Sequence, residues 1–323
     1  MSVLGIMTHN ARRPRRYGLY AREARRLGFE AVLLFEPGGV DLARRRIRGL
    51  RGDGETWRPC AAPLPDIAHD MGFYTDPKTI RRVKAIKAAA ALLPFTGYAL
   101  GHKWRIHKML QQTEFASRLP ETRLMRSPRD AIAAARRHGA VIVKPRDGKQ
   151  GKGIVKISAA GKNRWLWEER RSPPAALTEA ALAARLAARF RPGRAVLQRW
   201  LDIRCPHGGV FDIRVLMQRT EDGAWRRTAT AVRQSGVSRI ASNLAEGGAV
   251  REPGPFLAEL YGDEAVRILE DVRRVAEGLP PALEAACGKR FAELGIDLAV
   301  ERGGAGRIIE VNIKPGKKIV RAL

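Results

Sequence analysis

The sequence is poor in cysteine, in aromatic side chains and in long hydrophobic runs. Its 323 residues include three cysteines, Cys60, Cys205 and Cys287, and aromatic residues make up 6% of the chain. Three widely separated cysteines argue against a disulfide framework and against a CxxC metal site. No run approaches the ~18 consecutive apolar residues of a membrane helix. The first nine residues also lack the basic segment and long apolar core of a signal peptide, so we expect a cytoplasmic protein with no membrane partner.

Acidic side chains are scarce relative to basic ones. The chain has 60 Lys and Arg against 33 Asp and Glu, which gives a net charge of +27 at pH 7. A chain this basic suits phosphorylated ligands, an anionic surface or nucleic acid. Only 14 of the basic residues are lysines, however, and the arginines are spread along the whole chain, which a GC-rich genome explains equally well. The arginine clusters at 12–16 and 44–46 lack the neighbouring aromatic side chains that stack on bases, so nucleic acid is a less favoured partner.

The rest of the composition is that of a soluble globular protein. Apolar residues make up 45% and charged residues 29% of the chain, which is a typical balance for folded domains. At ~150 residues per domain, the length predicts two or three compact units. We detect no internal repeat and no low-complexity segment.

The N-terminal region, to about residue 100, is expected to form a small α/β domain. A helix over 17–27, with Leu19, Ala24 and Leu27 on one face, lies between apolar strands at 3–7 and 31–35. A strand–helix–strand order favours parallel pairing. Further short strands are expected at 57–60 and 66–70, and a further helix at 78–91.

The remaining residues alternate helices with hairpins. Ser127 and Pro128 are suited to begin a helix that stops at Gly139, and a buried strand at 140–145 follows it. Strands at 211–217 and 226–232 alternate apolar and polar residues as an antiparallel pair. The other expected elements are helices at 101–110, 178–190, 263–277 and 281–294, and strands at 154–157, 195–201, 296–300 and 307–312.

A glycine-rich loop follows the buried strand that ends at Lys144. Gly148, Gly151 and Gly153 would let backbone N–H groups approach an anion closely, and the Lys144 ammonium would point to the same place. A Walker loop or a dinucleotide fingerprint leads into a helix, whereas this loop leads into a strand. We therefore expect a phosphate-binding hairpin, the alternative being an ordinary hairpin loop with solvated lysines.

Two carboxylates and an amide gather on the last pair of strands. Glu310 and Asn312 share one face, because residues i and i+2 of a strand project together. The paired strand can bring Asp297 opposite them. Such an oxygen cluster suits Mg²⁺ beside phosphates. The alternative is a pair of surface carboxylates, but both strands are otherwise apolar, and buried carboxylates without a cation are costly.

Three other segments carry polar side chains in positions that suit a ligand site. The backbone of residues 198–201 can meet a purine edge between apolar walls, although a plain core strand explains this segment more simply. Asp212 and Arg214 share one face of their strand. Arg233 precedes a loop that contains Asn243 and closes on two glycines.

The order of these segments resembles the ATP-grasp superfamily. A helical lysine, Lys103, precedes Lys144 with its glycine loop, and the chain ends with Asp297 and then Glu310-Val311-Asn312. The succession is similar to that of D-alanine–D-alanine ligases and of the glutamate ligases that modify ribosomal protein tails. The carboxylate spacing with a following Pro-Gly is its most specific part.

Three features are most similar to the YheC/YheD branch, known as endospore coat-associated proteins. They are the short N-terminal α/β unit with His69-Asp70-Met71-Gly72, the segment Gly101-His102-Lys103-Trp104, and the ending Lys314-Pro315-Gly316. The resemblance implies an ATP-grasp fold, α/β (α+β), in which a small N-terminal α/β domain precedes two α+β subdomains that clasp ATP between them. The implied bounds are 1–100, 101–194 with the glycine loop, and 195–323 with the metal site.

The resemblance also implies a role for each matching residue. Lys103 and Lys144 match lysines that meet the nucleotide phosphates. Lys149 and Gln150 depart from the pattern, because related enzymes often have small residues there. The implied catalytic residues are Lys144, Arg233 and Asn243. The implied nucleotide-binding residues are Lys103, Lys144, Gly148, Gly151, Gly153, Gln198, Arg199, Trp200, Leu201 and Asp212. The implied metal ligands are Asp297, Glu310 and Asn312.

The activity that the resemblance implies is that of an ATP-dependent ligase working through an acyl phosphate. Its cofactors would be ATP and one or two Mg²⁺ ions, for which Mn²⁺ can substitute. Its partners would be an unidentified carboxylate and a nucleophile, and related ligases are often homodimers. Association with the spore coat would follow from the same resemblance. Two alternatives stay open: a coat-associated or nucleotide-binding protein without turnover, and a basic nucleic-acid-binding protein.

Overall fold

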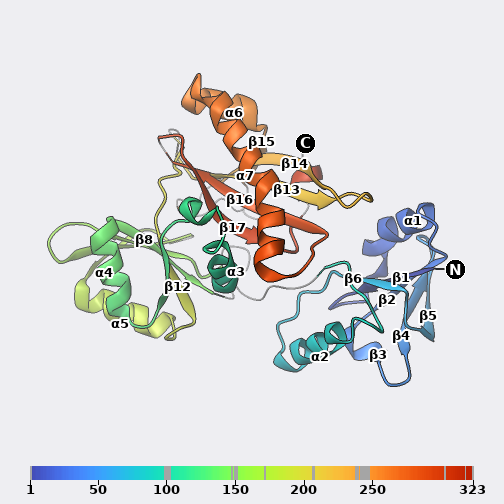
Figure 1. The fold of residues 1–323 in the computed structure, drawn as a ribbon. Helices are drawn as coiled ribbons and strands as arrows, with labels where there is room; N and C mark the ends of the chain where they lie inside the picture. The colour runs from blue at the N-terminus through green and yellow to red at the C-terminus, as the bar shows by residue number, and fades with distance from the viewer. Residues whose placement is uncertain are drawn as a thin grey trace. The chain divides into compact units, whose positions relative to one another are not determined.

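The computed structural model describes residues 2–97, 103–146, 148, 152–170, 172–205, 208–236, 240, 248–301, 303–316 and 318–321. It divides the chain into two compact units (Figure 1). The first comprises Met1–Ala99 with Lys289–Ala292, and the second comprises Leu100–Gly288 with Glu293–Leu323. Within the described ranges, no helix is both long enough and apolar enough to cross a bilayer.

The first unit is built on a mixed sheet. Its strands run in the order β3-β4-β2-β1-β6, and β5 pairs with β4. Strands β1 and β2 pair in parallel, as the sequence predicts, and β6 also pairs in parallel with β1. Strand β4 pairs antiparallel with β2, β3 and β5. The bounds are β1 Val3–Met7, β2 Ala31–Phe35, β3 Val40–Asp41, β4 Arg46–Gly52, β5 Trp57–Pro63, β6 Ile67–Asp70, α1 Gly18–Arg26 and α2 Pro77–Ala88, with short 3-10 helices η1 Pro14–Tyr17 and η2 Pro37–Gly39.

Alternating side chains of the parallel strands build two cores in this unit. Ile6 of β1 clusters with Ala21 of α1 on one side of the sheet. Phe35 of β2 clusters with Ile86 of α2 on the other. Because successive strand residues project to opposite faces, helices cover both faces and β2 is buried along its whole length.

The buried face of α1 differs from the one expected. Leu19 is 57% exposed and Leu27 is 72% exposed, while Tyr17, Ala21 and Ala24 face the core. Small side chains at Ala21 and Ala24 let the helix lie close to the sheet. The expected face is therefore correct for Ala24 and wrong for Leu19 and Leu27, because an apolar side chain is not always buried.

The second unit contains two sheets, of which the first has the order β11-β10-β9-β8-β12-β7. Helices α4 and α5 pack on one face over a core that includes Val143, Trp165 and Leu186. The predicted boundary at residue 195 falls at the start of β12, which pairs with β7 and β8. The bounds are β7 Thr122–Met125, β8 Ala140–Pro145, β9 Val155–Ala159, β10 Arg164–Glu169, β11 Ala175–Thr178, β12 Ala195–Arg199, α4 Pro128–His138 and α5 Glu179–Arg189.

The opposite face of this sheet carries polar side chains. Cross-strand register aligns Thr122, Gln198, Ile142, Lys156 and Glu168 in one row across five strands. Residues two apart along a strand share a face, so the Lys144 position adjoins this row on β8. The sheet therefore separates an apolar side, covered by helices, from a polar side that is available to a ligand.

The second sheet has the order β15-β14-β13-β16-β17. Its long helix α7 contacts β13, β14, β16 and β17, and α3 packs against both α7 and β17. The bounds are α3 Lys103–Leu110, β13 Phe211–Arg219, β14 Trp225–Gln234, β15 Ala249–Arg251, α6 Pro253–Tyr261, α7 Glu264–Cys287, β16 Glu293–Val300 and β17 Gly306–Asn312, with 3-10 helices η3 Ala116–Arg118 and η5 Lys318–Arg321.

Helix α7 corrects the expectation of two helices at 263–277 and 281–294. One helix runs from Glu264 to Cys287 with Pro280 and Pro281 inside it, and residue 293 already begins β16. A proline removes a backbone donor and usually ends a helix. Here the buried stripe continues through Leu279 and Leu283, so packing against the sheet keeps the helix in one piece.

Candidate functional site

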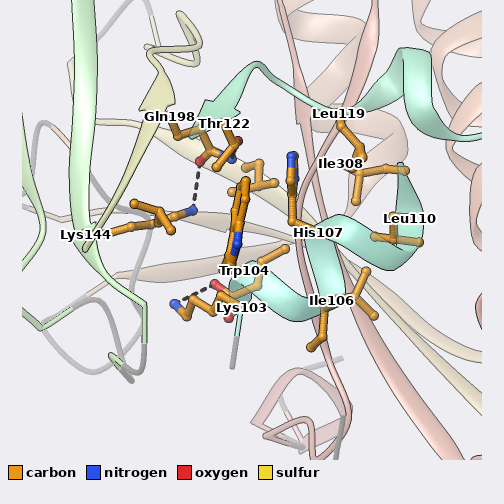
Figure 2. Close-up of a pocket in the computed structure, with 14 residues that line it drawn as sticks. Lys103, Trp104, Ile106, His107, Leu110, Leu119, Thr122, Lys144, Gln198 and Ile308 are labelled. Carbon is orange, nitrogen blue, oxygen red and sulfur yellow. Dashed lines mark hydrogen bonds and ion pairs between the residues drawn. The ribbon is translucent and has the colours of Figure 1, made fainter. Parts of the chain in front are cut away.

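A pocket of the second unit lies between α3, β17 and the polar side of the first sheet (Figure 2). It encloses about 430 Å³, part of it open to solvent. Two lysines and a glutamate provide its charged lining, and β17 supplies an apolar wall. The lining residues are Lys103, Trp104, Ile106, His107, Leu110, Leu119, Thr122, Lys144, Val196, Gln198 and the β17 residues Ile308, Ile309, Glu310 and Val311.

Lys144 is held in the pocket by a chain of hydrogen bonds. Its side chain is 7% exposed, and its Nζ donates to Gln198 Oε1 at 2.8 Å. Gln198 Nε2 donates to Thr122 Oγ1 at 3.2 Å, and that hydroxyl donates to the Pro120 carbonyl at 2.8 Å. Burial, with the neighbouring Lys103 ammonium, lowers the pKa of Lys144 to about 8. An anion in the pocket would therefore stabilise the charged form of this lysine.

Lys103 is the first residue of α3 and lies close to the end of β8. Its Nζ forms an ion pair with Glu310 Oε2 of β17 at 2.9 Å, and its backbone N–H donates to the Arg146 carbonyl at 3.2 Å. The structure thus brings Lys103, Lys144 and Glu310 together, although 207 residues separate the first from the last.

Asp297 lies in a buried network of ions in the second sheet. Arg214 stands directly across from it in the β13–β16 register and binds it with two nitrogens, Nε to Oδ1 and Nη2 to Oδ2, the latter at 2.9 Å. Arg233 Nη2 reaches Oδ1 at 3.1 Å. Burial raises the pKa of Asp297, but the guanidinium groups of Arg233 and Arg214 outweigh it and hold the pKa below its usual value.

Arg233 also binds Asp212, which faces it across the β13–β14 pair. Its Nε donates to Asp212 Oδ1 at 2.7 Å and its Nη2 donates to Oδ2 at 2.5 Å. Asp212 and Arg214 are 5% and 7% exposed. The predicted polar face of β13 is therefore buried, and its nucleotide-binding candidate Asp212 is engaged by the predicted catalytic residue Arg233.

The predicted metal ligands are neighbours in the sheet. Asp297 pairs with Glu310 in the β16–β17 register, and Asn312 Nδ2 donates to Asp297 Oδ2 at 3.2 Å. Among the described residues no three His, Cys, Asp or Glu side chains gather as a metal site. Two carboxylates and an amide oxygen still fit the donor preference of Mg²⁺, provided that their present partners release them.

The glycine loop is described at two of its predicted positions. The Gly148 N–H donates to the Pro145 carbonyl at 3.1 Å. Gly153 has φ +73°, and a Cβ there would stand 3.0 Å from Pro145 Cγ. A side chain at Gly153 would therefore be strained. Gly151 and Asn243 fall outside the residues that the structure describes.

The predicted purine-binding segment, residues 198–201, contributes one side chain to the pocket lining, that of Gln198. Arg199 Nη2 instead binds Glu301 Oε1 at 2.9 Å, and the Trp200 ring lies 4.9 Å from Lys156 Nζ. The backbone N–H groups of Arg199 and Trp200 donate to the carbonyls of Glu121 and Ala140. Leu201 is buried, and no described residue accepts from its N–H.

Sequence reasoning missed two aromatic residues of this pocket. Trp104 and His107 stack with ring centroids 5.5 Å apart and planes at 17°, and Figure 2 shows the indole between Lys144 and the His107 ring. Burial, with the charges of Lys144 and Lys108, lowers the pKa of His107 to about 4. Its Nε2 is buried without a hydrogen-bond partner among the described residues. The signals available were the place of Trp104 in the segment Gly101-His102-Lys103-Trp104 and the position of His107 one helical turn after Lys103.

Comparison with known proteins assigns the chain to a family. Residues 92–323 match the model of the YheC/D-like ATP-grasp family. The chain is 23% identical to the endospore coat-associated protein YheC of Bacillus subtilis (strain 168), over 99% of this chain and 90% of that protein. It is 25% identical to the endospore coat-associated protein YheD of the same strain, over 84% of this chain and 62% of that protein.

Solved structures share the fold at low sequence identity. D-cycloserine synthetase DcsG superposes with a TM-score of 0.58 at 14% identity, covering 99% of this chain and 94% of that one. D-alanyl-alanine synthetase A from Vibrio cholerae O1 biovar eltor str. N16961 superposes with a TM-score of 0.52 at 13% identity, covering 99% and 93%. These likenesses confirm the predicted ATP-grasp fold.

Proposed function

Because the chain belongs to the YheC/D-like ATP-grasp family, we propose that it is an ATP-dependent ligase that joins a carboxylate to an amine or a related nucleophile. The observation that carries the proposal is the convergence of Lys103, Lys144, Gln198 and Glu310 on one pocket. Two cationic side chains beside a carboxylate and a neutral amide suit a nucleotide with its phosphates and a divalent cation.

Each described candidate has a place in this proposal. Lys144, with the hydrogen-bond chain behind it, meets the phosphates as a fixed charge, and Lys103 meets them from α3. The N–H of Leu201 and the side chain of Gln198 meet the purine edge. Asp212, an implied nucleotide-binding residue, is available to the ribose only if Arg233 turns from it toward the γ-phosphate. Gly148 and Gly153 support the phosphate-binding loop.

The proposed reaction has two displacements. A carboxylate oxygen of the substrate attacks the γ-phosphorus of ATP, the bond to the β-phosphate oxygen breaks, and ADP leaves. The nucleophile's lone pair then attacks the acyl carbon, phosphate leaves, and the nucleophile loses its proton. Mg²⁺ held by Asp297, Glu310 and Asn312 would neutralise phosphate charge. The protein's own contribution is position and fixed positive charge from Lys144 and Arg233, so no covalent nucleophile is needed.

A nucleotide-binding protein without turnover is the second candidate. The observation that favours it is the network around Asp297, whose carboxylate is fully engaged by Arg214, Arg233 and Asn312. The names of the two Bacillus relatives add association with the spore coat to this candidate. Both candidates predict ATP binding, and only the ligase predicts release of ADP and phosphate.

Nucleotide binding is tested by thermal unfolding with and without ATP and Mg²⁺. A ligand that binds only the folded state raises Tm by mass action. Lys144→Ala should reduce the ATP-dependent shift, while Lys162→Ala, which removes an exposed lysine of the same sheet region, should leave it unchanged. An equal shift in both variants would remove Lys144 from the site. ADP release in the presence of carboxylate and amine mixtures then separates ligase from binding protein.

A further inference from the structure

The partners of Asp297 leave its carboxylate no free acceptor site. A carboxylate offers about four lone-pair positions. Oδ1 accepts from Arg214 Nε and lies 3.1 Å from Arg233 Nη2, while Oδ2 accepts from Arg214 Nη2 at 2.9 Å and from Asn312 Nδ2 at 3.2 Å. A metal ion can therefore bind this carboxylate only when one of these donors leaves.

The two arginines differ in how firmly they hold Asp297. Arg214 binds both oxygens from the neighbouring strand, and a Cβ at Gly295 would stand 2.9 Å from its Nη1, so the chain keeps space for this guanidinium. Arg233 makes its two shorter bonds to Asp212 and a single 3.1 Å contact to Asp297. The contact between Arg233 and Asp297 is therefore the one that a ligand can replace at the lowest cost.

The charges around Asp297 also indicate that Arg233 is the group that a ligand displaces. Asp212, Asp297 and Glu310 are matched by Arg214, Arg233 and Lys103, each in an ion pair. Lys144 also interacts electrostatically with Glu310 and Asp297, so a divalent cation arriving alone would meet a cluster without net negative charge, with Arg233 beside the oxygen it needs. Phosphate oxygens arriving with the cation would give Arg233 a new bidentate partner.

We propose that Arg233 is the resident counter-ion of Asp297, which excludes a divalent metal from the site until a nucleotide binds and takes over the guanidinium. The inference rests on the proposed nucleotide function. It adds that Arg233 determines the order of binding: the metal enters with the phosphates or after them, and the protein alone has no affinity for it. Arg214 stays in place as a positioning residue for Asp297.

The test is a titration of the full-length protein with Mn²⁺ in the absence of nucleotide, followed by the electron paramagnetic resonance signal of free Mn²⁺. The wild-type protein should leave this signal unchanged. Arg233→Gln removes one positive charge between two buried carboxylates, and its Mn²⁺ affinity should rise by about tenfold or more. Mn²⁺ should also raise the Tm of this variant. Arg219→Gln, on β13 of the same sheet, breaks an ion pair with Glu284 of α7 and should gain no affinity.

A second variant covers the case in which Arg233→Gln does not fold. Asp212→Asn with Arg233→Gln removes one charge of each sign and leaves the Arg214–Asp297 pair intact, so it should fold and show a smaller gain in Mn²⁺ affinity. Wild-type protein that binds Mn²⁺ as tightly as these variants would overturn the inference, and so would variants that gain nothing. If Mn²⁺ with ATP gives no thermal shift in the wild-type protein, the proposed function itself fails.

Discussion

The two sheets of the second unit hold their charged side chains in different ways. In the first sheet Lys144 is buried against neutral partners, Gln198 and then Thr122. In the second sheet Asp297 is buried among guanidinium groups that neutralise it. A buried charge on a neutral hydrogen-bond chain stays available to a ligand of opposite sign, while a paired charge must exchange partners first. The difference suggests that anions bind this protein directly and cations bind it by exchange.

The largest expected difference between the two buried charges is in their contribution to the free energy of unfolding. Asp297→Asn should lower the free energy of unfolding by about 3–5 kcal/mol, because it leaves two buried guanidinium groups short of a counter-charge. Lys144→Met should change it by no more than about 1 kcal/mol, since burial already disfavours that charge and one hydrogen bond is lost. Urea unfolding measures both, with Asp222→Asn in an exposed turn as the control. Equal losses in the two variants would contradict the contrast.

Turnover should depend on the metal ligands as one unit. Glu310→Gln keeps the side-chain volume but removes an anionic ligand, so ATP turnover should fall by about 100-fold or more with the fold intact. Asn312→Ala should act through the same ion, and the double variant should be little worse than either single one. The measurement is ADP release as a function of Mg²⁺ concentration. Additive losses would assign the two residues separate roles.

The pH dependence of nucleotide binding tests whether the buried Lys144 charge is available to an anion. With a pKa of about 8 in the free protein, Lys144 loses its proton between pH 7 and pH 9, so ATP affinity should fall by about tenfold over this range. The sign follows from the direction of the shift, because the bound phosphate requires the charged lysine. Calorimetry at several pH values measures the effect. Lys162→Ala should retain the dependence, and a similar dependence in Lys144→Met would assign it to another group.

Local patterns predicted the residues that share a strand or a loop. Asp297, Glu310 and Asn312 were found because strand residues alternate and a short turn joins the two strands. Lys144 was found because it ends an apolar run before glycines. Each of these inferences depends only on a few neighbouring residues. The structure does bring Asp297, Glu310 and Asn312 side by side.

Contacts that depend on distant pairing could not be predicted. Nothing in the sequence near Arg214 shows that β13 lies beside β16, so the sequence did not assign this arginine to Asp297. The position of α3 against β17 likewise depends on packing across the unit, which hid Trp104 and His107. Helix α7 was predicted as two helices because the buried stripe that overrides its prolines forms only against the sheet.

The smallest expected effect concerns His107, which lines the pocket. His107 Nε2 is buried without a partner among the described residues, and such an atom costs free energy in the empty protein. His107→Phe keeps a flat ring against Trp104 and removes the nitrogen, so the free energy of unfolding should rise by up to about 1 kcal/mol. If a ligand satisfies Nε2, the same variant should bind ATP more weakly, by about threefold to tenfold. Opposite signs for stability and affinity are the diagnostic result. His138→Phe, which breaks the contact of this last α4 residue with Glu121, should not raise stability and should leave ATP affinity unchanged. A fall in both quantities for His107→Phe would mean that the imidazole serves only to pack the indole.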